Sequence, residues 1–287
     1  MATAQTQPGG FSPGVAARLQ TTAGQRAFLK AVSPLPNALA PSFHRREARV
    51  ARLLPASAPA PRVLQLIEDD LEGWVALLIE DVEGVQPAVP WDPGQLARVI
   101  AAMNDLAAAL TPSPISAEEV GTAAEFLARN GTGWQRLLDE SSTALDQWSR
   151  RNLPRLAALA AEAPQRVTGD SLLHFDIRAD NVLLTPEQVY FVDWPHARVG
   201  PAWFDFVITA PSVAMQGGLE PEEFLGRSAA AAGADERAVD AAIAGVAAFF
   251  TWHALQPDPP GLPTLRSFQA AQADVARRWL ADRLDWR

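Results

Sequence analysis

The hydrophobic pattern of the chain changes near residues 86–90, and this change limits the folds open to it. Before that point, short apolar runs bounded by turn residues predict four strands, at 14–20, 26–32, 61–69 and 73–81. A stretch at 41–55 that contains a charged run is predicted to be a helix between the second and third of these strands. The order strand, strand, helix, strand, strand indicates a small, mostly antiparallel sheet that carries one helix.

The chain after residue 90 is predicted to be mainly helical. Asp92 is a helix cap, Pro93 suits the first helical position, and apolar residues then recur at spacings of three and four as far as Leu110. Further helices are predicted at 117–128, 132–149, 151–163, 201–215, 235–256 and 264–284. One interruption, at 167–194, has short strand-like pieces instead. The predicted fold class is therefore α+β.

The composition is that of a globular chain. With 287 residues, 48% of them hydrophobic and 20% charged, the chain can form one large unit or two lobes that share a cleft. It has no run near the roughly 20 apolar residues of a membrane-spanning helix and no signal-like start, so we expect a cytoplasmic protein without a membrane partner. It has no cysteine, which excludes disulfides, thiolate zinc sites and cysteine nucleophiles.

The formal net charge of -9 argues against nucleic acid as a partner, because a surface that binds a phosphate backbone needs clustered Lys and Arg. An acidic balance suits a small cationic substrate. It also serves solubility alone, so the charge does not decide between these readings.

A polar motif lies within the strand-like interruption. His174, Asp176 and Asn181 form the pattern H-x-D-x-x-x-x-N, and Asp193 follows Asn181 by twelve residues at the end of an apolar run. Phosphoryl transfer requires a carboxylate that faces a hydroxyl and hard oxygen ligands that face magnesium. Asp176 can supply the first, while Asn181 and Asp193 can supply the second. The short hairpin between Asn181 and Asp193 would bring all three to one wall of a cleft.

With these residues in these positions, the chain resembles the aminoglycoside phosphotransferase family, which is related to the protein kinases. The resemblance spans roughly residues 9 to 206. It implies a two-lobed protein-kinase-like fold, with a nucleotide-binding lobe at 1–83 and a larger helical lobe at 84–287 that holds the catalytic loop and the acceptor site. It also implies Mg²⁺ and either ATP or GTP as phosphoryl donor, bound between the lobes.

The same resemblance assigns roles to residues of the first lobe. Lys30 matches the lysine that holds the α- and β-phosphates, and Glu47 matches its ion-pair partner. The stretch that contains Glu80 and Val82 resembles the hinge between lobes, where backbone groups meet the base. A loop resembles the family's nucleotide-covering loop, and its residues predicted to bind the nucleotide are Gly9, Gly10, Ser12 and Gly14.

Three departures from the family pattern bear on these assignments. Phe175 stands where the family commonly has glycine, Pro195 stands where glycine or an acid is usual, and the glycine loop contains a proline. Arg178 takes the place of a lysine that protein kinases carry beside the transferring phosphate. We hypothesise that Arg178 stabilises negative charge in the transition state. Asp205, in the stretch after the metal aspartate, is expected to be structural.

The predicted activity is transfer of a γ-phosphate to a hydroxyl of a small molecule. The resemblance suggests an antibiotic, such as an aminoglycoside or a nucleoside, and hence a resistance enzyme. A metabolic kinase for choline, a sugar or an amino alcohol is the alternative within enzymes. A nucleotide-binding pseudokinase is a further alternative, although its usual signature, loss of the lysine, the base or a metal ligand, is absent from the sequence. His44, His196 and His253 have no zinc-site spacing and are expected to be solvated or packed.

Overall fold

The computed structural model describes residues 2–7, 14–69, 71–140 and 145–286. The N-terminal part forms a five-stranded antiparallel sheet whose strand order is β1-β2-β3-β5-β4. Its strands are β1 (Thr3–Thr6), β2 (Val15–Gln20), β3 (Arg26–Val32), β4 (Val63–Glu68) and β5 (Val75–Ile79). The four strands predicted from sequence are therefore confirmed, and β1 is an additional strand at the edge of the sheet that sequence reasoning missed.

Helix α1 (Ala40–Leu53) packs against β3, β4 and β5. Alternate residues of β5 point toward it, with Leu77 fully buried and Ile79 5% exposed. Together with Ala48 of α1 they form a small core of their own, separate from that of the helical part. The period of two in β5 and the amphipathic pattern of α1 thus meet across one interface.

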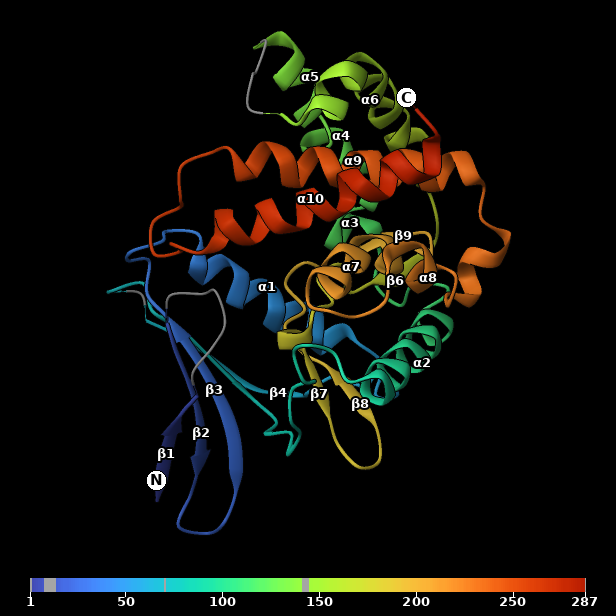
Figure 1. Ribbon diagram of the computed structural model, residues 1–287. Coiled ribbons are helices and arrows are strands. Elements are labelled where there is room, and N and C mark those ends of the chain that lie inside the picture. The colour runs from blue at the N-terminus through green and yellow to red at the C-terminus, as the bar shows by residue number, and fades with distance from the viewer. Residues whose placement is uncertain (1, 8–13, 70, 141–144, 287) are drawn as a thin grey trace.

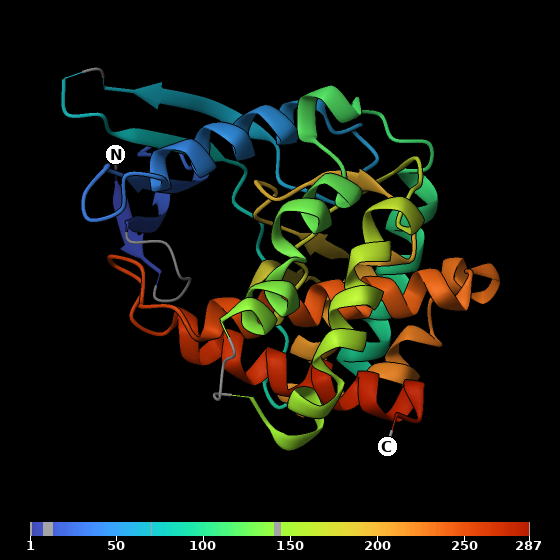
Figure 2. The same cartoon turned by 90° about the horizontal axis from the view of Figure 1, so that it is seen from above.

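The remainder of the chain is helical, as predicted. Figure 1 shows α9 and α10 crossing this part as an antiparallel pair, with the N-terminus in the sheet and the C-terminus at the far end of the molecule. Figure 2 shows from above how the green and orange helices gather on the opposite side from the sheet. The helices are α2 (Pro93–Ala109), α3 (Ala117–Val120), α4 (Ala123–Asn130), α5 (Gly133–Asp139), α6 (Gln147–Arg166), α7 (Phe204–Met215), α8 (Pro221–Leu225), α9 (Glu236–Ala254) and α10 (Leu265–Leu284), with 3-10 turns η1 (Ala179–Asn181) and η2 (Ala229–Gly233).

Helix α2 begins where the sequence predicted. The Asp92 carboxylate accepts a hydrogen bond from the Gln95 backbone N–H at 2.8 Å, which satisfies one of the free donors of the first turn. Pro93 occupies the first turn, and Leu96 and Met103 lie on the buried face. The predicted boundaries of this helix are confirmed to within one residue.

Three predicted helices, at 117–128, 132–149 and 151–163, have different boundaries. The helix predicted at 117–128 is divided into α3 and α4 by Gly121, whose φ of +74° belongs to the left-handed region. The break between 149 and 151 is wrong, because the Asp146 side chain caps a helix by accepting from the Ser149 N–H at 2.8 Å. Helix α6 therefore starts at Gln147. The short α8 was not predicted.

Two small two-stranded sheets carry the strand-like interruption. Strands β7 (Val182–Leu184) and β8 (Val189–Phe191) form the predicted hairpin, and β6 (Ser171–Leu173) pairs with β9 (Arg198–Gly200). Strand β9 lies beyond the predicted interruption, which ends at residue 194. The segment between β6 and β7 contains the H-x-D-x-x-x-x-N motif.

None of the helices in the described part of the chain combines the length and the apolar character that a bilayer span needs.

Candidate active site

The segment from His174 to Asn181 is held in place by Asp205, near the start of α7. The two carboxylate oxygens of Asp205 accept hydrogen bonds from the backbone N–H groups of His174 and Phe175, each at 2.8 Å. Burial raises the pKa of Asp205 to about 6, against the opposing effect of these two donors. The contacts agree with the structural role expected for Asp205.

His174 packs inside the loop and is fully buried. Its Nε2–H donates to the Val192 carbonyl at 2.9 Å, and its Nδ1 accepts from the Asp176 backbone N–H at 3.3 Å. Burial lowers the pKa of His174 to about 4, so the ring is neutral at physiological pH. One nitrogen donates and the other accepts, which is the pattern of a neutral imidazole that ties the loop to Val192, directly after β8.

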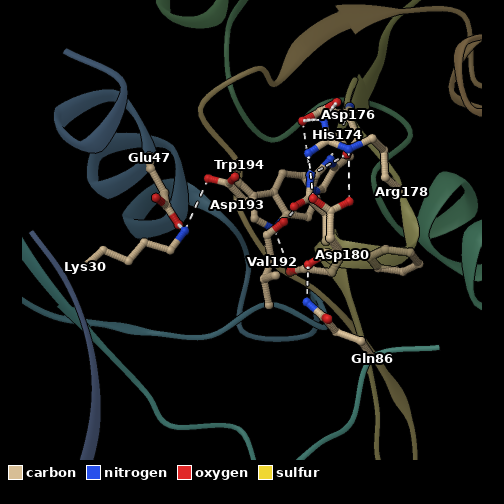
Figure 3. A network of polar contacts seen from close by, with 12 residues as sticks. Lys30, Glu47, Gln86, His174, Asp176, Arg178, Asp180, Val192, Asp193 and Trp194 are labelled. Carbon is tan, nitrogen blue, oxygen red and sulfur yellow. Dashed lines mark hydrogen bonds and ion pairs between the residues drawn. The ribbon is translucent and has the colours of Figure 1, made fainter. Parts of the chain in front are cut away.

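Asp176 lies at the centre of a set of polar contacts (Figure 3). Its carboxylate oxygens accept from Arg178 Nη1 at 2.7 and 2.8 Å, and one also accepts from Asn181 Nδ2 at 3.1 Å. On its other side, Arg178 donates to the Asp180 carboxylate at 3.0 and 2.9 Å. Burial raises the pKa of Asp176, while the Arg178 charge acts in the opposite direction. Asp176 and Asp180 thus share one guanidinium.

A second cluster joins the sheet to the helical part. Lys30 Nζ on β3 lies 2.7 Å from Glu47 Oε1 on α1 and 3.2 Å from Asp193 Oδ1, after β8 (Figure 3). Burial opposes the positive charge of Lys30, but Asp193 and Glu47 outweigh it and raise the lysine pKa. Burial also opposes the charge of Asp193, whereas Lys30 and His196 lower the pKa of this carboxyl to about 2. Lys30 and Asp193 are therefore both charged at neutral pH.

The hairpin β7–β8 links the two clusters. The Val192 N–H donates to the Asn181 carbonyl at 2.9 Å, so the residue before Asp193 is bonded to the end of the motif. Asp193 itself has a φ of +69°, which turns the chain sharply after β8. The geometry brings Asp176, Asn181 and Asp193 to one wall, as the sequence predicted.

A single cavity of about 750 Å³ contains most of the predicted site residues. Those that line it are Gly14, Lys30, Glu80, Val82, Asp176, Arg178, Asn181 and Asp193. Glu47 lies behind Lys30 and is 4% exposed. Gly9, Gly10 and Ser12 lie outside the described residues.

Gly14 closes the sheet side of this cavity. A Cβ atom at Gly14 would lie 2.5 Å from both the Ala31 carbonyl oxygen and Val32 Cγ1, so a larger residue would displace β3. In the segment predicted to contact the nucleotide base, the Glu80 N–H donates to the Arg62 carbonyl at 2.8 Å, and the Val82 carbonyl accepts from Arg18 at 3.3 Å.

Sequence reasoning missed several residues of the site. Asp180 lies inside the quoted motif but was given no role, although its carboxylate holds Arg178. Gln86 Nε2 donates to the Asp180 carbonyl at 3.0 Å from the segment where the sequence pattern changes. His44 is buried and lines the cavity, and burial lowers its pKa to about 4. Only the position of Asp180 within the motif gave a signal that sequence reasoning could have used.

The donor set suits magnesium that is shared with phosphates. Asp193 is ionised, and Asn181 uses its amide nitrogen toward Asp176, at 2.8 Å to the carbonyl and 3.1 Å to the carboxylate, which directs its amide oxygen elsewhere. Within the described ranges, no group of three or more His, Asp or Glu side chains could hold a metal by itself. One carboxylate and one amide oxygen leave further positions for water and phosphate oxygens, which is the usual environment of Mg²⁺.

Comparisons with known proteins agree with this geometry. The model of the phosphotransferase enzyme family matches residues 4–243. A comparison with curated protein sequences gives no significant match.

Among solved structures, an apo thermostable mutant of aminoglycoside phosphotransferase APH(4)-Ia has a TM-score of 0.62 and 16% identity, over 97% of this chain and 95% of that one. A choline/ethanolamine kinase family protein from Mesorhizobium loti has a TM-score of 0.57 and 19% identity, over 98% and 87%. Amicoumacin kinase hAmiN, in complex with AMP-PNP, Ca²⁺ and Ami, has a TM-score of 0.59 and 10% identity, over 98% and 88%. These similarities show a common kinase-like fold. Together with the family match over most of its length, they show that this chain belongs to the phosphotransferase enzyme family.

Proposed function

We propose that this phosphotransferase moves the γ-phosphoryl group of Mg-ATP or Mg-GTP to a hydroxyl of a small molecule. The observation that carries the proposal is the convergence of Lys30, Asp176, Asn181 and Asp193 on one cavity. They come from β3, the motif loop and the end of β8, and a structural role alone does not require them to face a common space. A carboxylate, a cation and two oxygen ligands are the groups that in-line phosphoryl transfer uses.

In the proposed mechanism, Asp176 accepts a hydrogen bond from the acceptor hydroxyl and orients it toward the γ-phosphorus. The hydroxyl oxygen forms a bond to phosphorus while the bond to the β,γ-bridging oxygen breaks, and the nucleoside diphosphate leaves. The hydroxyl proton passes to Asp176. Lys30, positioned by Glu47, holds the α- and β-phosphates. Asn181 and Asp193 would hold Mg²⁺, which when bound would neutralise charge on the phosphates.

Arg178 is proposed to stabilise the charge of the transferring phosphoryl group. It lies next to Asp176 and lines the cavity, and a guanidinium matches phosphate oxygens well. Because it is bonded to Asp176 and Asp180, it keeps a fixed place beside the reacting atoms. If Arg178→Ala folds and retains its turnover rate, this role is refuted.

The nucleotide is proposed to lie between a sheet lobe at 1–83 and a helical lobe at 84–287. Backbone groups of Glu80 and Val82 would contact the base, and the loop with Gly9, Gly10, Ser12 and Gly14 would cover the phosphates. The reaction would take place in the cytoplasm, where ATP and GTP are available.

For the acceptor, we propose an antibiotic or a related hydroxylated metabolite, so that phosphorylation would inactivate the compound and confer resistance. The names of the similar structures, which include an aminoglycoside phosphotransferase and amicoumacin kinase, support this. A metabolic kinase for choline, a sugar or an amino alcohol is the second candidate, and the choline/ethanolamine kinase family neighbour favours it. A pseudokinase is disfavoured by the ionised Asp193 and the intact ion pair of Lys30.

The test is an assay of transfer to a panel of hydroxyl-bearing antibiotics and metabolites with Mg²⁺ and ATP or GTP, followed by mass. A gain of one phosphate that disappears in Asp176→Ala would support the proposal. If both nucleotides bind but no panel member gains a phosphate, the protein is a pseudokinase or its acceptor lies outside the panel; if neither binds, the assignment of the cavity is wrong. Growth of a susceptible bacterium that expresses the protein would then separate a resistance enzyme from a metabolic kinase.

A further inference from the structure

The cavity has an aromatic end that begins beside Asp176. Phe175 follows His174 and precedes Asp176, and its ring lies 4.9 Å from that of Phe126 on α4. Phe126 in turn lies 5.2 Å from Phe249 on α9. The ring of Phe268 on α10 lies 5.6 Å from the Arg178 guanidinium. All these rings line the cavity, so apolar surface extends from the proposed base into the helical part.

Among the residues that the structure describes, this end of the cavity carries no charged side chain of its own. Apart from the segment 175–196, the lining residues that the described helical part contributes are apolar except for three glutamines, Gln86, Gln269 and Gln272. A buried ammonium group costs several kcal/mol unless a carboxylate replaces its water shell. A polycationic acceptor would find no such group among these residues.

The carboxylates elsewhere in the cavity already have cationic partners. Asp176 and Asp180 share Arg178, and Asp193 contacts Lys30. The remaining lining acids are Glu80, which pairs with Arg62, and Asp81, which pairs with Arg18 and Arg26. An incoming cation would have to displace one of these side chains.

A positive charge also lies behind the aromatic rings. The Arg198 guanidinium is 5.4 Å from the ring centroids of both Phe126 and Phe175 and is not itself part of the cavity wall. Burial and the charge of Arg46 lower the pKa of Arg198 to about 10, which leaves it protonated at neutral pH. Its field acts against a second cation at this end.

Gln272 is a polar group that the fold itself does not use. Its residue is 4% exposed, it lines the cavity, and its side chain makes no hydrogen bond within the described ranges. Gln269, by contrast, accepts from Arg266 at 2.8 Å. An amide that lines a cavity and has no partner within the described ranges is free to bond to a polar atom of a ligand.

Building on the proposed function, we infer that the acceptor is an uncharged hydroxyl compound with an extended apolar or aromatic face, not a polycation. Its flat face would pack against Phe126 and Phe249, a polar atom would bond to Gln272, and its reactive hydroxyl would meet Asp176. This replaces the cationic substrate that the net charge of -9 suggested from sequence, because the acidic residues of the cavity are paired.

The test is calorimetric binding to the full chain saturated with Mg²⁺ and a non-hydrolysable ATP analogue. The uncharged probes are chloramphenicol, estradiol and thymidine, and the cationic probes are kanamycin, hygromycin B and choline. We expect at least one uncharged probe to bind tenfold or more tightly than every cation. Gln272→Leu should weaken that probe about tenfold, as loss of a buried hydrogen bond does. Gln135→Leu, the same exchange at an exposed position of α5 outside the cavity, should leave it unchanged.

Each outcome is decisive. The inference is overturned if a cationic probe binds more tightly than all uncharged ones, if no uncharged probe binds, or if Gln272→Leu has no effect. Binding of the nucleotide analogue and mass-detected transfer from ATP are measured in parallel. Uncharged binding without transfer would support the acceptor chemistry while refuting the kinase activity. Transfer of phosphate to kanamycin would support the kinase activity while refuting the proposed acceptor chemistry.

Discussion

Phe175 offers a direct way to weigh backbone strain against packing in the catalytic loop. Its φ of +71° lies in the left-handed region, which is unfavourable for a bulky residue. The side chain is nevertheless 5% exposed and stacks on Phe204 at 5.2 Å while it contacts Phe126 edge-on. Replacement by glycine, the residue common in the family at this position, removes the strain and the packing together. Replacement by alanine removes only the packing.

The cost of lost packing and the cost of the left-handed conformation differ enough to predict which of the two variants is more stable. Truncation of a buried Phe costs about 3–5 kcal/mol of unfolding free energy, whereas the left-handed conformation costs about 1–2 kcal/mol. Glycine relieves the left-handed strain, but its greater conformational freedom in the unfolded chain offsets about 0.5–1 kcal/mol of that gain. We therefore expect Phe175→Ala to lose about 4 kcal/mol and Phe175→Gly about 3 kcal/mol. Glycine should be the more stable of the two, the reverse of the order in a regular helix or strand.

Thermal unfolding followed by circular dichroism can resolve this order. For a chain of this length, 1 kcal/mol corresponds to about 2 °C in Tm, so the glycine variant should melt about 6 °C below the wild type and about 2 °C above the alanine variant. An alanine variant more stable than the glycine variant would show that the positive φ carries no cost. A glycine variant more stable than the wild type would show that strain, not packing, dominates at Phe175.

Three further predictions concern His174, Glu47 and Asp205, whose contacts position the residues of the proposed active site. Burial lowers the pKa of His174 from 6.5 to about 4, so the neutral buried ring stabilises the fold fully above pH 6.5, and this stabilisation is lost as the pH falls toward 4. Between pH 7 and 5, the unfolding free energy measured in urea should therefore fall by about 2 kcal/mol more in the wild type than in His174→Gln. Glu47→Gln should raise the KM for ATP, because Lys30 loses its charged partner at 2.7 Å, and should lower the unfolding free energy by about 2 kcal/mol. An unchanged KM would show that Glu47 does not position the lysine at the phosphates. Asp205→Asn replaces an acceptor oxygen with a donor facing a backbone N–H, so turnover should fall at least tenfold with folding retained at 20 °C; unimpaired turnover would show that these two bonds do not position the loop.

The sheet and the longer helices could be predicted because their signals are local. Strand β5 alternates buried and half-buried residues, and α2 has a cap, a first-turn proline and a regular apolar face. Strand β1 was missed because Thr3–Thr6 is exposed along its whole length and has no hydrophobic pattern. It is specified by its hydrogen bonds to β2, which sequence periodicity does not reveal.

Some residues of the site could likewise be placed from sequence, and others could not. Asp176, Asn181 and Asp193 could be placed on one wall because the hairpin between them is short and its sequence is apolar. Gln86 could not, because its contact with the Asp180 carbonyl depends on how the segment after β5 crosses the motif loop. Gln272 lies 91 residues after Asn181, near the middle of α10, and only the packing of α10 against α9 and α7 brings it to the cavity.

Two variants can test whether Asp176 acts on the acceptor while Asp193 acts through magnesium. Calorimetry with and without Mg²⁺ would give the ATP affinity of Asp176→Asn and Asp193→Asn, and ADP formation would give their turnover. We predict that Asp176→Asn binds Mg-ATP within about threefold of the wild type but loses turnover by about 100-fold or more. Asp193→Asn should bind Mg-ATP about tenfold more weakly, with no loss of affinity when Mg²⁺ is removed. Retained turnover in Asp176→Asn, or a loss of affinity in Asp193→Asn that is the same without Mg²⁺, would refute these roles of the two carboxylates.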